Sequence, residues 1–194
     1  MEGVAFFNDF SNLLGECTNS SGGDCQAGEA FNGDAVEVMG LELTARWDAA
    51  SGFNLSNISM PITVAYSYTD AQFKTSFNSA FFGTVSAGDE LIYVPEHQFT
   101  LGTGLVGETW GLNALLNYVS EARDTPGQGA IPATESIDAR TIVDLSAYYE
   151  IAEGIRLKAK VENLFDESYL AARRPAGLRP GKPQEVLFGF EVRF

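Results

Sequence analysis

Apolar and charged residues alternate near the end of the chain, and this alternation predicts two β-strands. In residues 155–162 every second residue is apolar, and each residue between them is charged. In residues 185–194 one face carries Val186, Phe188, Phe190, Val192 and Phe194, and the other carries Glu185, Leu187, Gly189, Glu191 and Arg193. Residues 163–183 contain polar residues with Gly and Pro, which predicts a loop. We therefore expect a hairpin with one apolar and one largely polar face.

The same period of two predicts six further strands earlier in the chain. They are expected at residues 4–14, 35–48, 58–77, 93–105, 110–120 and 140–151. In residues 35–48, for example, Leu41 and Leu43 share one face and Glu42 lies on the other. The first strand alternates poorly, with Phe6 opposite Phe7, so the pattern leaves its orientation open. The predicted fold class is all-β, an antiparallel meander of about eight strands.

The connections between these strands differ in length in a regular way. Long connections follow the first, third, fifth and seventh strands, whereas tight turns lie at residues 106–108 and 152–154. Aromatic residues recur near the expected strand ends, at Trp47, Tyr68, Tyr93, Trp110, Tyr149 and Tyr169. A soluble sheet can show the same alternation, but outer-membrane barrels combine short turns, long loops and aromatic girdles. These features favour strands that cross a membrane.

Composition and charge remove other classes of protein. The formal net charge of -14 argues against binding to nucleic acid, which requires a basic surface. The chain of 194 residues is long enough for one domain, and it contains no apolar run of about 18 residues. Twenty glycines and fourteen phenylalanines suit a fold with many strands and turns.

Three short motifs near the end of the chain resemble a known family. They are Asn163, Leu164, Phe165 and Asp166 with Tyr169; then Arg179, Pro180 and Gly181; then Gly189, Val192 and the terminal Phe194. Their order is similar to the C-terminal end of TonB-dependent outer-membrane receptors, whose last strand carries a signal for the barrel insertion machinery. Leu187 departs from the polar residue usual at the start of that signal. Weaker similarities at residues 40–42, 94–98 and 143–145 extend the resemblance over nearly the whole chain.

The resemblance implies a function as well as a fold. Residues 1–194 would be the C-terminal part of a barrel of about 22 strands in the bacterial outer membrane, without the plug domain and the earlier strands. Residues 1–7 show no basic segment, apolar stretch and cleavage site, so we expect a fragment of a longer protein. The receptor would take up a ferric chelate and receive energy from TonB through the plug. The resemblance implies no cofactor.

A narrower similarity concerns the ligand. The loop that contains Cys17 and Cys25, followed by residues 31–33, and the later residues 129–135 are most similar to receptors of the ferric dicitrate type. Ferric citrate or another siderophore complex is therefore the expected cargo.

Cys17 and Cys25 lie in a glycine-rich loop, which in an exported protein predicts a disulfide. Two cysteines do not make a zinc site without partners, and the only histidine, His97, is far along the chain. We interpret His97 as a loop-to-strand junction rather than a ligand or base. The sequence shows no Ser/His/Asp or Cys/His pairing, so we expect neither a catalytic nor a metal site.

Two groups of basic residues are candidates for ligand contact. Arg156, Lys158 and Lys160 form a row on one strand face, either as a lumen wall paired with Glu191 or as a track that guides an anionic chelate. In the last long loop, Arg173 and Arg174 are the candidate ligand contacts. Arg179, which belongs to the family motif, is expected to be structural.

Two alternatives remain open at this point. A stand-alone barrel of eight strands could serve a structural or adhesion role, and a soluble β-barrel could bind a ligand inside. The first requires hydrogen bonds between the first and last strands, whereas a receptor fragment should form an open sheet with two unpaired edges.

Overall fold

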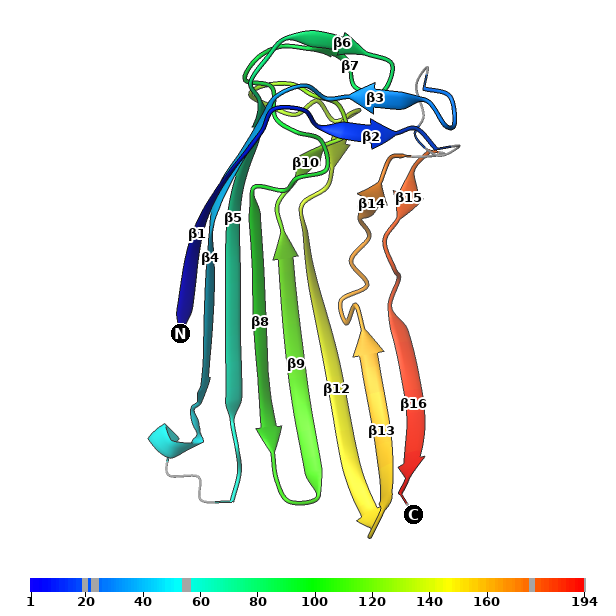
Figure 1. Cartoon of the computed structure of the whole chain (residues 1–194). Helices are drawn as coiled ribbons and strands as arrows, with labels where there is room; N and C mark the ends of the chain where they lie inside the picture. The colour runs from blue at the N-terminus through cyan, green and yellow to red at the C-terminus, as the bar shows by residue number, and fades with distance from the viewer. Residues whose placement is uncertain (19–20, 22–24, 54–56, 175–176, 194) are drawn as a thin grey trace.

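Eight strands form one antiparallel sheet in the computed structural model, which describes residues 1–18, 21, 25–53, 57–174 and 177–193 (Figure 1). Their spatial order is β1 (Glu2–Phe10), β4 (Val36–Asp48), β5 (Pro61–Phe73), β8 (His97–Val106), β9 (Trp110–Val119), β12 (Arg140–Ala152), β13 (Ile155–Glu162) and β16 (Glu185–Val192). Each strand pairs with its neighbours in chain order, so the predicted all-β meander is confirmed. Within the described part of the chain, no helix has the length and apolarity needed to cross a membrane.

Three predicted strand boundaries were wrong, and local contacts explain the differences. β1 ends at Phe10 and β5 at Phe73, before the predicted ends at residues 14 and 77. Residues beyond these ends form separate short hairpins. β8 begins at His97 rather than at residue 93, because Pro95 has no N–H to donate to a ladder.

The strand register confirms that the basic row and the apolar face of the last strand lie on opposite sides of the sheet. Arg156 pairs with Glu191, and Leu157 pairs with Phe190. Directly paired residues point to the same side, so the basic side chains face away from the phenylalanines. Phe188 and Phe190 are 83% and 75% exposed, so this face is an uncovered apolar surface.

The register also orients β1, whose facing the sequence left open. Phe6 pairs with Gly40 of β4, and Gly40 pairs with Thr69 of β5, on the polar face of the sheet. A Cβ atom at residue 40 would lie 2.6 Å from Cζ of Phe6. The same Cβ would lie 2.1 Å from the carbonyl oxygen of Tyr68, so glycine is needed because this backbone atom and the Phe6 ring fill the space.

Each of the four long connections carries a short hairpin at the same end of the sheet (Figure 1). The pairs are β2 (Leu14–Glu16) with β3 (Ala30–Asn32), β6 (Phe77–Ser79) with β7 (Gly83–Val85), β10 (Ala122–Arg123) with β11 (Ser136–Ile137), and β14 (Leu170–Ala172) with β15 (Arg179–Pro180). We call residues 11–35, 74–96, 120–139 and 163–184 together the loop layer. At the other end lie the short connections 107–109 and 153–154 and the 3₁₀ helix η1 (Ala50–Phe53).

The hydrophobic core lies in this layer rather than along the sheet. Val36 and Phe73, at the ends of β4 and β5, are fully buried against Phe82 and Val85 of the second long connection. Most side chains of the eight-stranded sheet are at least partly exposed. The loop layer is therefore a folded unit that the strands support.

Candidate functional site

Aromatic rings join the first two connections of the loop layer. The rings of Phe31 and Phe81 stack with centroids 4.3 Å apart, and Phe82 meets Phe31 edge to face at 5.4 Å. Phe82 also packs edge to face on Phe73 at 5.1 Å, which ties both connections to β5. Offset-stacked and edge-to-face ring pairs stabilise a fold by more than the burial of their apolar area alone. The two connections therefore hold each other in place.

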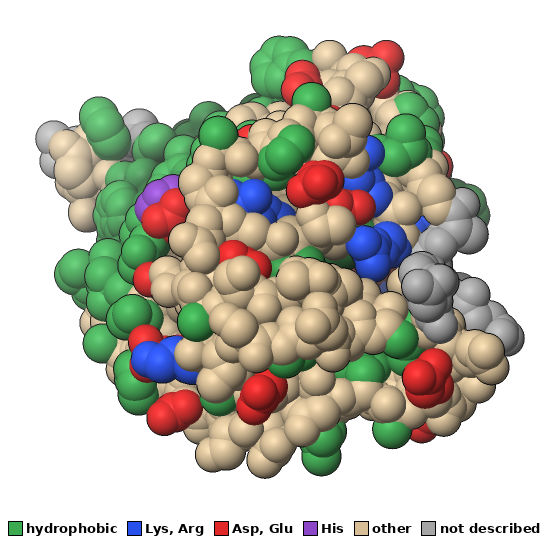
Figure 2. All heavy atoms as spheres, turned by 90° about the horizontal axis from the view of Figure 1, so that it is seen from above, with side chains coloured by type: hydrophobic (Ala, Val, Ile, Leu, Met, Phe, Trp, Pro, Cys, Tyr) green, Lys and Arg blue, Asp and Glu red, His purple; other side chains and the backbone are tan. Residues whose placement is uncertain are grey.

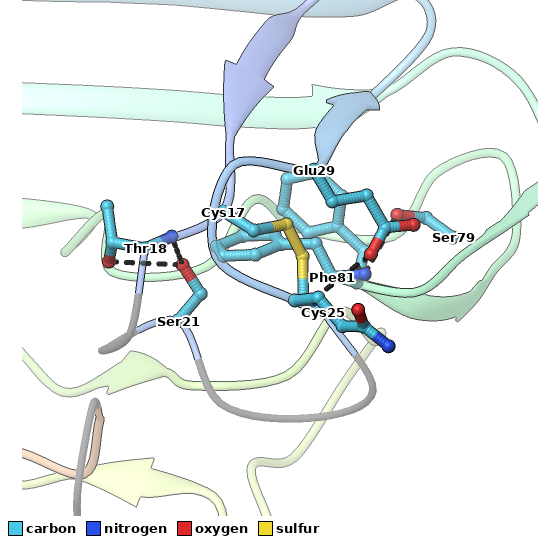
Figure 3. The surroundings of a disulfide bond; sticks show 9 residues. Cys17, Thr18, Ser21, Cys25, Glu29, Ser79 and Phe81 are labelled. Carbon is cyan, nitrogen blue, oxygen red and sulfur yellow. Dashed lines mark hydrogen bonds between the residues drawn. A yellow bond between two sulfur atoms is a disulfide. The ribbon is translucent and has the colours of Figure 1, made fainter.

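A disulfide closes the first connection, as the sequence predicted (Figure 3). Cys17 and Cys25 have Cα atoms 5.8 Å apart, within the range of natural disulfides. The backbone N–H of Cys17 donates to Glu29 O at 2.8 Å, and Gly28 N–H donates to Cys17 O at 2.8 Å. The bond thus braces the β2–β3 hairpin; residues 19–20 and 22–24 of this loop lie outside the described residues.

The carboxylate of Glu29 lies within 4.8 Å of both sulfur atoms. Three such groups could hold a metal ion if both sulfurs were thiolates, since thiolate is the form that binds metals. The sulfurs are bonded to each other, and no cysteine is free. The group is therefore a structural bridge in this state.

Arg123 joins the second connection to the third. Its side chain is 3% exposed, its Nε donates to Glu90 Oε2 at 2.7 Å, and its Nη2 donates to Gly129 O. Glu90 N–H in turn donates to Gly127 O at 2.9 Å. A buried guanidinium with these acceptors is a strong, directional link. The sequence analysis missed Arg123, because an arginine outside any motif gives no signal of burial.

Tyr93 joins the second, third and fourth connections. Its N–H donates to Arg123 O at 2.8 Å, and its hydroxyl accepts the backbone N–H groups of Arg173 and Arg174 at 3.3 and 2.9 Å. Its φ of 60° is uncommon for a bulky residue, so the contacts must hold the backbone there. The sequence placed Tyr93 among the aromatic residues of a girdle near the strand ends; in the structure its hydroxyl and backbone N–H bond within the loop layer.

The two candidate ligand contacts differ in how their side chains are engaged. Arg173 donates from Nε to Ser136 O and from Nη2 to Ala133 O, both at 2.7 Å. Among the described residues Arg174 makes no comparable side-chain contact: its Nε lies 3.9 Å from Asp124 Oδ2, and its side chain is 29% exposed. Arg173 is thus committed to holding the third connection, and Arg174 is the freer of the two.

Asp124 is an unusual carboxylate in the loop layer. The residue is 8% exposed, and its Oδ1 has no hydrogen-bond partner among the described residues. Burial raises the pKa of this carboxyl, and the positive charges of Arg174 and Arg173 oppose the rise. Figure 2, which looks down onto the loop layer, shows basic side chains beside acidic ones near the middle of this face.

The basic row on β13 is neutralised by neighbouring glutamates. Lys158 pairs with Glu191, as the lumen-wall interpretation predicted, and Arg156 contacts Glu150 at 3.2 Å. Lys160 pairs with Glu162 of the same strand. These pairs leave little net positive charge on this face of the sheet. The interpretation of the row as a lumen wall is therefore favoured over its interpretation as a track that guides an anionic chelate.

The family motif forms the base of the last connection. Asn163 is 3% exposed, with φ of 50°, a region that asparagine tolerates better than most residues. Its Nδ2 donates to the carbonyls of Glu167 and Lys182 at 3.0 and 2.9 Å, and its Oδ1 accepts Glu167 N–H at 2.9 Å. Its own N–H donates to Asp144 Oδ1 at 2.9 Å. Asn163 therefore ties both ends of the connection to β12.

The remaining motif residues complete this base. Leu164 N–H donates to Val143 O at 2.7 Å, and Asp166 Oδ1 accepts Gln184 N–H at 3.0 Å. Gly181 lies against Tyr169: a Cβ at residue 181 would lie 2.0 Å from the ring. The other motif members are placed as follows: Phe165 is 71% exposed, Arg179 Nη2 donates to Arg174 O, and Pro180 pairs with Leu170.

The terminal-strand residues and the histidine complete the predicted set. Gly189 and Val192 lie in β16, on the polar and apolar faces respectively, and Phe194 lies outside the described residues. His97 begins β8, as the loop-to-strand interpretation requires, and its Nδ1 lies 2.9 Å from the Tyr66 hydroxyl.

Comparison with known protein families gives one match that covers most of the chain. Residues 2–164 match the family described as TonB dependent receptor-like, beta-barrel. The vitamin B12 transporter BtuB of Vibrio vulnificus (strain YJ016) is 36% identical over 70 residues, 36% of this chain and 10% of that protein. The metal-pseudopaline receptor CntO of Pseudomonas aeruginosa (strain UCBPP-PA14) is 28% identical over 167 residues, 80% of this chain and 22% of that protein.

Solved structures share the fold. The ferric-catecholate import receptor Fiu of E. coli K12 superposes with a TM-score of 0.70 at 20% identity, over 99% of this chain and 25% of Fiu. The unliganded ferric citrate transporter FecA gives a TM-score of 0.67 at 22% identity, over 82% of this chain and 24% of FecA. The chain thus spans about a quarter or less of each of these four proteins.

Proposed function

Because this chain belongs to the TonB-dependent receptor-like β-barrel family, we propose that it is the C-terminal part of a receptor that takes up a ferric chelate. Barrels of this family lie in the outer membrane of Gram-negative bacteria. The observation that carries the proposal is the family match over residues 2–164 together with an open eight-stranded sheet. The work proposed is binding and translocation, with no chemical reaction.

The sheet edges support a larger barrel. β1 and β16 are the two ends of the strand order, so each carries unpaired backbone groups. A hydrocarbon environment satisfies none of these groups, so an open edge there requires further strands. We propose that earlier strands of the same receptor complete a barrel of about 22 strands. The stand-alone barrel of eight strands would need β1 paired with β16, and no such pair occurs among the described residues.

The polar face of the sheet has room for another part of the receptor. It carries a hollow of about 310 Å³ lined in part by Gly102, Asn113, Asp144 and Lys160. Small residues leave room beside this wall for another part of the receptor. We propose that the plug domain lies there and transmits energy from TonB. The outer-membrane lipid meets the apolar face, and the barrel insertion machinery reads β16.

The proposed cargo is an anionic ferric chelate of the citrate or siderophore type. Two of the similar structures are a ferric-catecholate import receptor and a ferric citrate transporter, and the relative CntO is named a metal-pseudopaline receptor. Arg174, whose side chain is partly exposed on the loop layer, offers a cationic donor to such a ligand. By contrast, the vitamin B12 transporter BtuB suggests a competing cargo that the experiment must separate.

Transport by the complete receptor tests the proposal. Cells that lack their own receptors and express the complete gene are given radioactive iron as ferric citrate, and separately radioactive vitamin B12, with and without TonB. We expect TonB-dependent iron uptake that is reduced several-fold by Arg174→Gln. A matched control is Arg46→Gln, a change near the opposite end of the strands. Uptake of vitamin B12 without uptake of iron would reject a ferric chelate as cargo, and uptake of neither compound would reject ferric citrate.

A further inference from the structure

The pair formed by Asp124 and Arg174 is the feature of the loop layer that its architecture does not explain. Tyr93, Arg123 and Arg173 each make hydrogen bonds that join connections. Asp124 instead keeps one buried carboxylate oxygen that has no hydrogen-bond partner within the part of the chain that the structure describes, which is costly in a folded protein. Since this unpartnered carboxylate oxygen does not stabilise the fold, it points to a role for Asp124 in ligand binding.

The backbone of Arg174 is held by hydrogen bonds on both sides, whereas its guanidinium makes only a long ion pair among the described residues. Its N–H donates to the Tyr93 hydroxyl at 2.9 Å, and its carbonyl accepts a hydrogen bond from Arg179. Its guanidinium approaches Asp124 only to 3.9 Å, beyond hydrogen-bonding distance. The guanidinium can therefore turn toward a ligand while the backbone stays in place.

We propose that Arg174 is shared between Asp124 and an anionic ligand, and that Asp124 takes up a proton from solution when Arg174 turns to the ligand. This inference rests on the proposed function and adds to it a coupling between anion binding and proton uptake. No bond other than the new O–H of Asp124 forms. The proton neutralises the buried carboxylate that Arg174 leaves behind.

The charges that face Asp124 support this exchange. They are Arg174 and Arg173, which favour its ionised form, and Glu135, which opposes it; Glu135 Oε2 also accepts a hydrogen bond from the Thr125 hydroxyl at 2.6 Å. Arg173 is held by Ser136 O and Ala133 O, so it does not replace Arg174 when the latter moves. Burial already raises the pKa of Asp124, and loss of the nearest cation raises it further.

The first test measures the affinity of the complete receptor for ferric citrate at several pH values. If ligand binding takes up a proton, affinity must rise as pH falls, by up to about tenfold per pH unit for one proton. Ferric citrate itself changes with pH, so the readout is the difference between the wild type and Asp124→Asn. We expect the variant to lose the extra pH dependence and keep binding.

A matched control is Glu121→Gln, which removes an exposed carboxylate from the same connection. This control should retain the wild-type pH dependence. Equal pH dependence in the wild type and Asp124→Asn would overturn the coupling while leaving ferric chelate uptake intact. Absence of any ferric citrate binding would count against the proposed function instead.

The second test needs no ligand, so it holds even if the cargo is different. Infrared titration of the receptor, with Asp124→Asn identifying the band, follows protonation of this carboxyl directly. In Arg174→Gln, Asp124 should become protonated at a higher pH than in the wild type. An unchanged midpoint would mean that Arg174 does not control Asp124, and the proposal would be wrong.

Discussion

At the scale of single residues, Asn163 is the most connected member of the family motif. Its side chain makes three hydrogen bonds to backbone groups that have come together from residues 167 and 182. Asn163 itself is buried, so removing its amide takes away the partner that these backbone groups have inside the fold. Asn163 therefore acts as a structural device that holds the two ends of the last connection together.

We predict that Asn163→Ala destabilises the last hairpin by roughly 1–3 kcal/mol, because backbone groups of Glu167 and Lys182 lose their hydrogen-bond partner. The positive φ adds to this cost, since alanine tolerates that region poorly. Urea unfolding of the receptor in detergent, followed by tryptophan fluorescence, measures the change. Phe165→Ala is the control, since Phe165 is 71% exposed and should change stability little. An effect of Asn163→Ala no larger than the control would contradict this role.

At the scale of elements, the loop layer is held by different forces in its two halves. The first two connections share an aromatic core with a disulfide, and the last three share hydrogen bonds through Arg123 and Tyr93. The second connection belongs to both halves, so it links them. A substitution in one half of the loop layer should therefore destabilise that half and have little effect on the stability of the eight-stranded sheet.

The disulfide provides a test of this local effect. We expect no reactive thiol in the denatured, unreduced protein, and two after reduction. Replacing Cys17 and Cys25 by Ser should destabilise the β2–β3 hairpin by roughly 2–3 kcal/mol, from the entropy of the opened loop. Hydrogen exchange should quicken in residues 11–35 and not in β12 or β13. Two reactive thiols before reduction would reject the bridge.

The strand faces give a second prediction at this scale. Phe190 lies on the exposed apolar face of β16, and Leu187 lies on the other face, paired with Lys160. Arginine at mid-strand on a lipid-facing position costs roughly 2–4 kcal/mol, and much less toward a lumen. Phe190→Arg should therefore impair folding of the receptor into lipid vesicles far more than Leu187→Arg does. Equal yields of folded protein from the two variants would contradict the assigned faces.

At the scale of the whole molecule, the unpaired edges decide how the chain behaves alone. β1 and β16 each pair on one side only within the described part of the chain. Lipid cannot replace the missing partners, so an isolated sheet of this kind is unstable in a bilayer. This agrees with the proposal that further strands complete the sheet as part of a larger barrel.

We therefore predict that residues 1–194 expressed alone do not insert into lipid vesicles. Their edges should instead pair with other copies and aggregate. Flotation of vesicles and the heat-dependent shift of the band on gels measure insertion and folding. The complete receptor, treated in the same way, is the positive control. A monomeric, heat-modifiable band from residues 1–194 would show that the eight strands close on themselves.

The sequence by itself determined the strands, their order and the two faces of most of them. Alternation in residues 155–162 and 185–192 is a local property, because side-chain direction in a strand depends only on position along it. The motif around Asn163 and the disulfide between Cys17 and Cys25 were also predictable, since their members lie close in the chain or in a known order.

The tertiary structure alone decided which loop residues meet. Tyr93 bonds to Arg174, which is 81 residues away, and Arg123 bonds to Glu90 across 33 residues. The facing of β1 likewise came from its register with β4, because Phe6 finds its place opposite Gly40. Nothing periodic marks such partners in the sequence. They are selected by the geometry of neighbouring strands, which brings distant loops together and leaves Asp124 buried beside Arg174.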